Sequence, residues 1–308
     1  MTFLNDSVNE NIRKTLRPAL LIVNPVSGKK LILRHLCDVI CSLTDGGYLV
    51  TVMVTEKRGD ACEFVKRYGR DFALVCCTGG DGTLNEVITG LASEEIHVPL
   101  GYIPCGSTND FAASHSLALS IPEAVSNIIS CRQTRYDIGR FGSKYFTYVA
   151  AFGAFSWLSY TTDQNLKNVL GHTAYIIDAI KDLYKIRPYH LRITSNGVTY
   201  EDDYIFGAVC NSLSIAGAIE LPKDIIDTAD GLFEVLLIRM PETIFDLDTI
   251  IHGLLTQNYS NPFIKFFQTA AVDIENEPGL IWTLDGESSG EIERVHIEPI
   301  PGFLNLQG

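Results

Sequence analysis

The sequence predicts a two-domain protein, with an α/β N-terminal domain on a parallel, Rossmann-like sheet and a β-rich, sandwich-like C-terminal domain. In the first half of the chain, strand patterns alternate with helical patterns, and repeated β-α-β units form parallel sheets covered by helices on both faces. After about residue 135, short strand patterns follow one another instead. The chain has 308 residues, enough for two hydrophobic cores. We therefore predict domains at residues 1–134 and 135–308, with the last residues able to return to the first domain.

The elements of the first domain follow from its apolar runs and glycines. Ala19–Val23 is an unbroken apolar run that ends at Asn24, which suits a strand buried on both faces. Helical spacing then runs from Lys30 to Leu43 and is closed by two glycines. The remaining patterns predict, in order, a strand at Tyr48–Thr55, a helix at Asp60–Tyr68, a strand at Phe72–Cys77, a helix at Leu84–Leu91 and a strand at Val98–Pro104.

The second domain is predicted mainly from short runs of β-forming residues. Ser195-Asn196-Gly197 is a typical hairpin turn between two of these runs. Two amphipathic patterns, across Leu166–Leu183 and Ile244–Leu254, predict helices within the β-rich region. The predicted strands are Tyr136–Phe141, Lys144–Ala151, His190–Ser195, Val198–Gly207, Phe233–Arg239, Ala270–Glu275 and Leu280–Leu284.

Composition and charge exclude several classes of protein. The formal net charge of −13 argues against a nucleic-acid partner, which requires a basic surface, and against strong electrostatic adhesion to anionic lipid. The polar N-terminus lacks the pattern of a signal peptide, and no apolar stretch approaches the length of a membrane span. These features predict a cytoplasmic protein that can still associate peripherally with a membrane.

The eight cysteines predict reduced thiols rather than a metal site or disulfides. None forms a CxxC pair, and several lie inside apolar runs. Cys37 and Cys41, with His35 nearby, could form one corner of a metal site, but no second ligand pair follows. Their spacing instead predicts that they continue an apolar helix face formed by Leu33, Leu36 and Ile40.

The stretch Gly79-Gly80-Asp81-Gly82-Thr83 is the first candidate binding loop. It joins a predicted strand to a helix that we expect to begin near Thr83, and it contains no lysine. Glycines let backbone amides approach an anion closely, and the helix adds its N-terminal dipole, so phosphate is the expected ligand. The alternative is an ordinary strand-to-helix turn with Thr83 as N-cap and Asp81 holding the turn.

Two further polar loops also follow predicted strands. Asn24–Lys30 contains Ser27, Gly28 and two lysines, and Pro104–Phe111 contains Gly106-Ser107-Thr108-Asn109-Asp110. In open α/β sheets, ligands bind beyond the carboxyl ends of the strands, which is where all three loops should meet. Together they predict a phosphate-binding site.

These motifs resemble the diacylglycerol kinase catalytic domain family, and in particular its soluble bacterial branch. The resemblance rests on Asn24-Pro25-x-Ser27-Gly28, on Gly79–Thr83 followed by Asn85-Glu86, and on Gly106–Phe111. It continues through Asp137-Ile138-Gly139, Leu166-Lys167, Asp230-Gly231-Leu232 and Asp285-Gly286-Glu287, and so covers nearly the whole chain.

The resemblance implies a lipid kinase that transfers the γ-phosphoryl group of ATP to a lipid hydroxyl, with diacylglycerol as the first candidate and phosphatidic acid as its product. It implies that Asp81, Asp110 and Asp137 form an acidic network for catalytic Mg²⁺, which prefers oxygen ligands and keeps several waters. Lys29 and Lys167 are further candidate phosphate partners. The implied nucleotide-binding residues are Asn24, Ser27, Gly28, Lys29, Gly79, Gly80, Asp81, Gly82, Thr83, Gly106, Ser107, Thr108 and Asn109.

The resemblance also assigns two acidic turns in the second domain. Asp285 would be the base for the acceptor hydroxyl, supported by Glu287, although Asp285-Gly286 alone reads as a hairpin turn. Asp227, Asp230 and the carbonyl of Leu232 would hold a structural Mg²⁺ near a dimer-forming region, which predicts a homodimer. Asp224 could replace Asp227 as a ligand, and a solvated acidic turn is the alternative.

Three functions remain open on the sequence alone. An NAD kinase-like enzyme or a non-catalytic nucleotide-binding relative would share the first domain. The position of Asn85-Glu86 and the closing Asp285-Gly286-Glu287 favour a lipid kinase. The acceptor could be diacylglycerol, a sphingoid base, a monoacylglycerol or an undecaprenol-type alcohol at a membrane surface. Candidate residues for its acyl pocket are Phe152, Phe155, Trp157 and Leu158.

Overall fold

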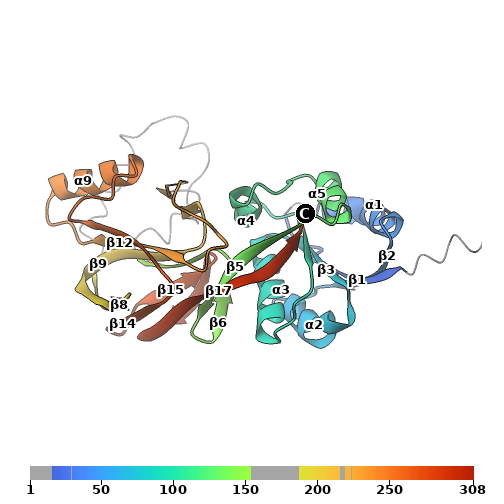
Figure 1. The fold of residues 1–308 in the computed structure, drawn as a ribbon, viewed down its shortest axis with the longest axis horizontal. Coiled ribbons are helices and arrows are strands. Elements are labelled where there is room, and N and C mark those ends of the chain that lie inside the picture. The colour runs from blue at the N-terminus through green and yellow to red at the C-terminus, as the bar shows by residue number, and fades with distance from the viewer. Residues whose placement is uncertain (1–15, 29, 154–186, 216–218, 223) are drawn as a thin grey trace, which may run out of the picture. The chain divides into compact units, whose positions relative to one another are not determined.

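The structure, a computed structural model, describes residues 16–28, 30–153, 187–215, 219–222 and 224–308 (Figure 1). The chain forms two compact units, of which unit 1 comprises Met1–Tyr136 with Phe303–Gly308 and unit 2 comprises Asp137–Gly302. The division therefore follows Tyr136, where the sequence analysis places it after residue 134. Lys29, Lys167, the predicted helix at 166–183 and the pocket candidates Phe155, Trp157 and Leu158 lie outside the described residues.

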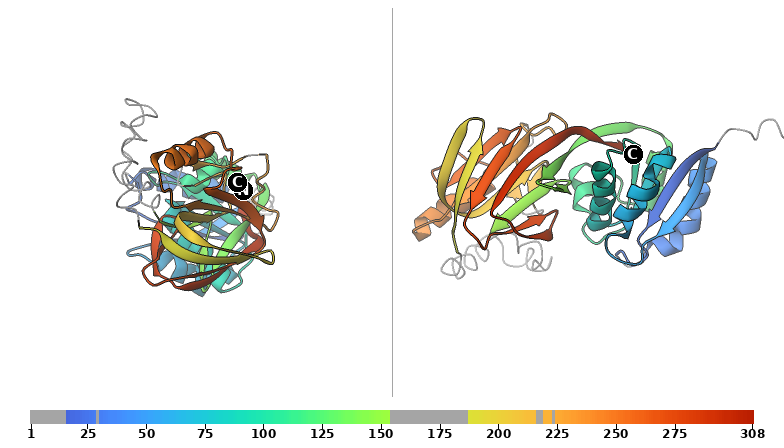
Figure 2. Two further views of the ribbon diagram at one scale, coloured as in Figure 1. Left: turned by 90° about the vertical axis from the view of Figure 1, so that its left-hand side faces the viewer. Right: turned by 90° about the horizontal axis from the view of Figure 1, so that it is seen from below.

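Unit 1 contains the predicted parallel sheet. Its strands are β1 (Arg17–Val23), β2 (Tyr48–Val54), β3 (Leu74–Gly79) and β4 (Leu100–Pro104), in the order β2-β1-β3-β4. Figure 2 shows β1 and β2, in blue, side by side at one edge of this sheet. At the other edge, the end of β17 (Arg294–Gln307) lies parallel to β4, with Leu306 opposite Leu100.

Helices cover both faces of this sheet, as the β-α-β pattern predicts. The helices α1 (Ile32–Asp45) and α5 (Ile121–Ile129) pack on one face, and α2 (Asp60–Tyr68) and α3 (Asp81–Ser93) lie on the other (Figure 1). Two short helices complete the unit, η1 (Gly69–Asp71) and α4 (Asp110–Ser114). All five residues of Ala19–Val23 are buried, which confirms a strand covered on both faces.

The predicted apolar face of α1 is partly wrong. Cys37 and Cys41 are exposed, and Leu33 is 52% exposed. The buried residues of this helix are Ile32, Val39 and Leu43, so the face that meets the sheet is rotated away from the two cysteines. Helical periodicity shows which residues share an apolar face, but it does not show how much of that face the sheet covers. Leu33 lies on the part of the face that the sheet leaves exposed.

Unit 2 is a β-rich structure of antiparallel strands. Most of them form one sheet in the order β16-β15-β7-β9-β8-β14-β17, and β12 pairs with both β9 and β13. One helix, α9 (Ile244–Leu255), confirms the second amphipathic pattern and begins with a capping box between Thr243 and Asp246. The strands are β5 (Gln133–Phe141), β6 (Lys144–Phe146), β7 (Val149–Gly153), β8 (Tyr189–Ser195), β9 (Val198–Cys210), β10 (Ser214–Ile215), β11 (Ile219–Glu220), β12 (Phe233–Arg239), β13 (Ile264–Thr269), β14 (Val272–Asn276), β15 (Ile281–Leu284), β16 (Glu287–Glu291) and β17.

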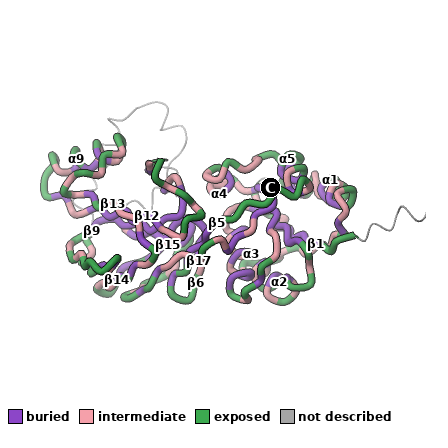
Figure 3. Tube along the Cα trace, viewed as in Figure 1, coloured by how far each residue is buried: buried purple, intermediate pink, exposed green. Residues whose placement is uncertain are grey.

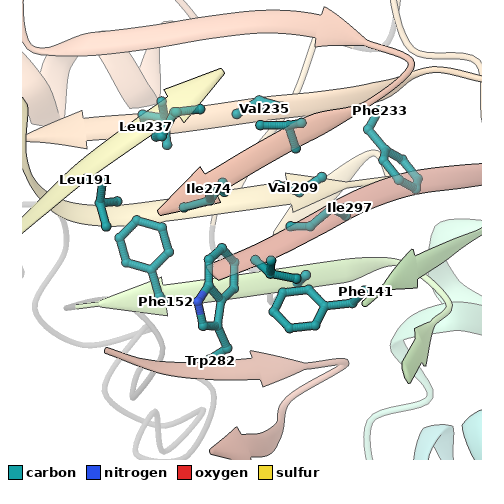
Figure 4. Packing of buried hydrophobic residues seen from close by; sticks show 14 of the residues in the cluster. Phe141, Phe152, Leu191, Val209, Phe233, Val235, Leu237, Ile274, Trp282 and Ile297 are labelled. Atoms are coloured by element: carbon teal, nitrogen blue, oxygen red, sulfur yellow. The ribbon is translucent and has the colours of Figure 1, made fainter. Parts of the chain in front are cut away.

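The core of unit 2 combines aromatic rings with a larger number of aliphatic side chains (Figure 4). The fully buried ring of Trp282 lies 5.0 Å from that of Phe141 and 4.9 Å from that of Phe152, both in edge contacts. Phe152 is therefore a core residue and not the wall of an open acyl pocket. Figure 3 shows buried residues concentrated along the strands of each unit.

The sequence analysis missed the last strand and several shorter elements. It predicted no strand for β13, β16 or β17, and no helix for α4 or α5. In β17, Pro299 and Pro301 lack backbone N–H donors, which lowers the strand signal of a segment that is otherwise rich in β-forming residues. None of the described helices is long and apolar enough to cross a membrane.

Candidate functional site

The three predicted loops of unit 1 meet at one edge of its sheet. The strands β1, β3 and β4 are parallel and in register, with Val23 opposite Thr78 and Gly79 opposite Pro104. Backbone hydrogen bonds continue past the strand ends, because Asn24 N donates to Thr78 O at 3.0 Å and Cys105 N donates to Gly79 O at 2.7 Å. The loops that follow therefore start side by side, at the edge where such folds bind ligands.

Glycines allow the backbones of these loops to touch. A Cβ added to Gly106 would lie 2.5 Å from Gly80 Cα, and one added to Gly28 would lie 2.3 Å from Cys105 O. Gly28 also has φ +52°, a left-handed value that favours glycine. The hydroxyl of Ser27 donates to Cys105 O at 3.3 Å and joins the first loop to the third. The result is a compact surface of backbone amides, which suits phosphate.

Asn24 and Thr83 connect the first loop to α3. Asn24 Nδ2 donates to Thr83 Oγ1 at 2.9 Å, and Asn24 Oδ1 accepts from Val26 N at 3.1 Å. The expected start of the helix near Thr83 is wrong, because α3 begins at Asp81 with Gly80 in the N-cap position. Thr83 is buried inside the first turn, so its side chain fastens the loop and does not cap the helix.

Asp81 ties the glycine loop to the third loop. Its Oδ2 accepts from Asp110 N at 3.0 Å and from the hydroxyl of Thr108 at 3.4 Å, and its Oδ1 accepts from Phe111 N at 3.1 Å. The structure therefore brings Asp81 and Asp110 together. Both Asp81 oxygens are already hydrogen-bonded, so a role with Mg²⁺ through intervening water suits this carboxylate better than a fully committed ligand.

Asn109 shapes the third loop. It has φ +53°, and its side chain accepts from Gly106 N at 2.8 Å and donates to Gly106 O at 3.2 Å. Asparagine adopts this left-handed conformation more readily than most residues. The resulting turn leaves Ser107 and Thr108 exposed at its tip, where their hydroxyls can reach a ligand.

A fourth loop at the same edge was missed by the sequence analysis. Residues 55–59 follow β2, and Thr55 N donates to Val23 O at 2.9 Å. Glu86 of α3 accepts from Gly59 N at 2.8 Å and from Ala61 N at 3.2 Å, so it caps α2 and holds this loop. Lys57 and Arg58 add positive charge there. The position of this loop could have been predicted from the sequence, since every loop that follows a parallel strand emerges at this edge.

Asp137 lies in unit 2, whereas Asp81 and Asp110 lie in unit 1. It is 1% exposed, and its carboxylate accepts from Gly231 N at 2.7 Å and from Gly302 N at 2.6 Å. It thus joins the Asp227–Leu232 turn to β17. No group of three or more His, Cys, Asp and Glu side chains that could hold a metal occurs among the residues that the structure describes.

The turn predicted to hold a structural cation is exposed and acidic. Asp227 Oδ1 accepts from Ala229 N at 3.0 Å, and Asp230 Oδ1 accepts from Leu232 N at 2.9 Å. The second oxygen of each carboxylate accepts no hydrogen bond from the described part of the chain. Nearby Glu234 is fully buried, which raises its pKa to about 7, and the charges of Asp230 and Asp227 add to this shift. Carboxylate oxygens of this kind are the ligand type that a hard divalent cation prefers.

Neutralising Asp230 is expected to remove a Mg²⁺-dependent gain in thermal stability. In Asp230→Asn the amide oxygen can still accept from Leu232 N, so the variant changes charge while keeping the turn. Melting curves with Mg²⁺ and with chelator should differ for the wild type and coincide for the variant, because a ligand of the folded state stabilises it.

A matched series decides between Asp224 and Asp227 as the second ligand. Asp224→Asn and Asp227→Asn should be compared with Asp230→Asn in the same melting experiment. Loss of the Mg²⁺ effect in only one of the first two variants identifies the ligand. An effect of Mg²⁺ that survives in Asp230→Asn would rule out this turn as the site.

Asp285 occupies the turn between β15 and β16. Asp285 has φ +49° and Gly286 has φ +81°, the left-handed pair that a two-residue hairpin turn requires. Yet the Asp285 side chain is only 8% exposed. Glu287, the other predicted catalytic carboxylate, is exposed at the start of β16. The turn therefore places these two carboxylates in different environments and does not present them as a pair.

The Asp285 carboxylate accepts hydrogen bonds from three consecutive residues. Its Oδ2 accepts from Thr147 N at 2.7 Å and Thr147 Oγ1 at 2.8 Å, and its Oδ1 accepts from Tyr148 N at 3.0 Å and Val149 N at 3.1 Å. Burial raises the pKa of the Asp285 carboxyl, and these hydrogen bonds oppose that rise. A buried acid held in this way is a candidate for chemistry.

Two family models match this chain. The diacylglycerol kinase catalytic domain family matches residues 18–141, and the YegS C-terminal NAD kinase beta sandwich-like domain matches residues 156–308. A crystal structure of a diacylglycerol kinase from Bacillus anthracis shares the fold with a TM-score of 0.74 and 22% identity, over 96% of this chain and 98% of that one.

Curated relatives show the same relationship at the level of sequence. The diacylglycerol kinase of Staphylococcus haemolyticus is 31% identical over 291 residues, which cover 94% of this chain and 86% of the relative. That of Staphylococcus saprophyticus is 31% identical over 292 residues, or 94% and 92% of the two chains. The chain therefore belongs to the diacylglycerol kinase family.

Proposed function

We propose that this protein is an ATP-dependent lipid kinase that phosphorylates diacylglycerol to phosphatidic acid and so acts in phospholipid metabolism. The observation that carries the proposal is the meeting of three glycine loops at one sheet edge, where Gly106 and Gly80 are too close for a side chain between them. Such a surface binds phosphate through backbone amides and needs no P-loop lysine.

The nucleotide would be held by the loops of unit 1. Amides near Gly28, Gly80 and Gly106 would contact its phosphates, with the basic side chains of Lys29, Lys57 and Arg58 balancing charge. Asp81 and Asp110 of unit 1 would hold Mg²⁺, in part through water. When bound, Mg²⁺ neutralises charge on the phosphates during transfer.

Asp285 would act on the acceptor. Its carboxylate would orient the lipid hydroxyl and take its proton as the hydroxyl oxygen bonds to the γ-phosphorus, while the bond from that phosphorus to the bridging oxygen breaks and ADP leaves. The four hydrogen bonds from residues 147–149 fix the position and orientation of this side chain. Glu287, exposed on the same hairpin, would support Asp285 or its metal rather than replace it as the base.

The direct test is a screen of lipid acceptors with radiolabelled ATP and Mg²⁺. Diacylglycerol, a monoacylglycerol, a sphingoid base and undecaprenol are presented in mixed micelles, with NAD as a soluble acceptor. We expect label in phosphatidic acid. Label in NAD would identify an NAD kinase-like enzyme, label in a sphingoid base would change the substrate class, and ATP binding without any transfer would indicate a non-catalytic relative.

We also propose that the protein works at a membrane surface as a homodimer in the cytoplasm. The proposed acceptor resides in a bilayer, while the net charge of −13 disfavours anionic lipid. Flotation with neutral vesicles that contain diacylglycerol tests the first point. Analytical ultracentrifugation tests the second, and a monomer across the micromolar range would contradict it.

A further inference from the structure

Four hydrogen bonds to the Asp285 carboxylate come from one short segment of the chain. Three consecutive backbone N–H groups, of Thr147, Tyr148 and Val149, donate to the carboxylate from the link after β6 and the first residue of β7. The hydroxyl of Thr147 adds a fourth donor at 2.8 Å. Thr147 therefore supplies two hydrogen bonds to Oδ2, one from its backbone and one from its side chain.

Both partners are withdrawn from water. Thr147 is 3% exposed and Asp285 is 8% exposed. A carboxylate in such a place becomes neutral unless hydrogen bonds compensate for the lost hydration. The Thr147 hydroxyl is one of the groups that compensate, and because its oxygen sits on a β-branched side chain with few rotamers, it also fixes the direction of Oδ2.

The hairpin itself does not require this arrangement. Asp-Gly forms such a two-residue turn through its backbone preferences alone, with the side chain free to face water. Burying a charge and surrounding it with donors is costlier than burying an apolar side chain of similar size. The donors around Asp285 are thus better explained by a need for a fixed, ionised carboxylate than by the stability of the turn.

We propose that Thr147 is a positioning residue for Asp285: its hydroxyl keeps the carboxylate ionised and aimed for phosphoryl transfer. The inference rests on the proposed function, since it gives Asp285 the role of orienting and deprotonating the acceptor. It adds a residue that the motifs do not contain. Thr147 acts through Asp285 and need not touch the lipid.

Thr147→Val is the test variant, because valine keeps the branched shape and the backbone N–H but lacks the hydroxyl. Thr147→Ser restores a hydroxyl. Thr283→Val is the matched control, since Thr283 Oγ1 donates to Ala151 O at 3.1 Å on the neighbouring strands without bonding to Asp285. If Thr147→Val fails to fold, Thr147→Ala removes the same hydroxyl without added crowding.

Two measurements are made on each variant. The first is the pH profile of kcat/KM for diacylglycerol, together with KM for ATP. The second is the pKa of Asp285 by carbon-13 NMR of carboxyl-labelled aspartate, with the Asp285 signal assigned by its loss in Asp285→Asn. The NMR measurement needs no activity, so it separates failure of this inference from failure of the proposed function.

In Thr147→Val we expect the Asp285 pKa and the acid limb of the profile to rise together by about one to two pH units, the size of one hydrogen bond to a charged group. KM for ATP should stay unchanged in Thr147→Val. Thr147→Ser should resemble the wild type, and Thr283→Val should shift neither the Asp285 pKa nor the acid limb of the profile. An unchanged Asp285 pKa in Thr147→Val overturns the inference. A raised Asp285 pKa with an unaltered pH profile of kcat/KM also overturns it, because the hydroxyl would then have only a structural role. A wild type that phosphorylates no lipid overturns the proposed function, and with it the catalytic meaning of any pKa shift.

Discussion

Asp285→Asn is expected to reduce phosphorylation of diacylglycerol by about 10²–10⁴-fold, the usual contribution of a positioned acid–base group. Phosphoryl transfer depends mainly on positioning and charge neutralisation, so the reaction should be slowed and not abolished. ATP binding should stay near that of the wild type, because the nucleotide loops belong to unit 1. Initial rates at saturating ATP and lipid, with an ATP-dependent melting shift, measure both quantities.

The structure adds a requirement to this experiment. Asparagine offers one acceptor oxygen, and its amide NH₂ would face N–H donors that now reach the second Asp285 oxygen. Each rate must therefore be paired with a melting temperature. Glu287→Gln changes an exposed carboxylate on the same hairpin and should have a much smaller effect. If Asp285→Asn is folded and as active as the wild type, the closing Asp-Gly-Glu is only a turn.

Asp81→Asn is expected to weaken ATP binding, which Asp285→Asn should leave near that of the wild type. Asp81 accepts from Asp110 N and Phe111 N, so its loss should disturb the third loop together with Mg²⁺-dependent ATP binding. The apparent KM for ATP should rise strongly. Equal effects of Asp81→Asn and Asp285→Asn on ATP binding would contradict the division of roles between them.

Gly80→Val is expected to abolish the stabilisation of the protein by Mg²⁺–ATP. For the wild type, ATP at 100 times its Kd should raise the free energy of unfolding by about 2.7 kcal/mol. A Cβ at residue 80 would lie 3.1 Å from Gly106 Cα and would crowd the surface where the amides of the two loops meet. The backbone at Gly80 has φ −94°, which valine can adopt, so the fold should survive.

The matched control replaces a glycine elsewhere in unit 1. Gly47 precedes β2, so it lies at the opposite, amino-terminal edge of the sheet, and a Cβ there meets no atom within 4 Å. Its φ of +88° is best tolerated by asparagine among the larger residues. Gly47→Asn should retain the full ATP shift. A full shift in Gly80→Val would show that nucleotide binds elsewhere.

The sequence by itself determined the alternating strands and helices of the parallel sheet and the position of the three glycine loops. Each strand of the parallel sheet is a local apolar run, and each helix between strands is a local periodic pattern, so neighbours in the chain suffice to predict them. The meeting of the three loops also follows without coordinates, because the carboxyl ends of parallel strands share one edge. The glycines in those loops likewise predict, from the sequence alone, that backbones approach closely there.

Only the tertiary structure decided which distant groups satisfy the buried charges. Thr147 and Asp285 are 138 residues apart, and Asp137 is 165 residues from Gly302. No local pattern links such partners, since their contact depends on the path of the chain through the antiparallel sheet. The same is true of Cys37 and Cys41, whose exposure depends on which side of α1 meets the sheet. A buried carboxylate must find donors, but the sequence does not say which part of the chain will provide them, because a hydrogen bond depends on proximity in space and not along the chain.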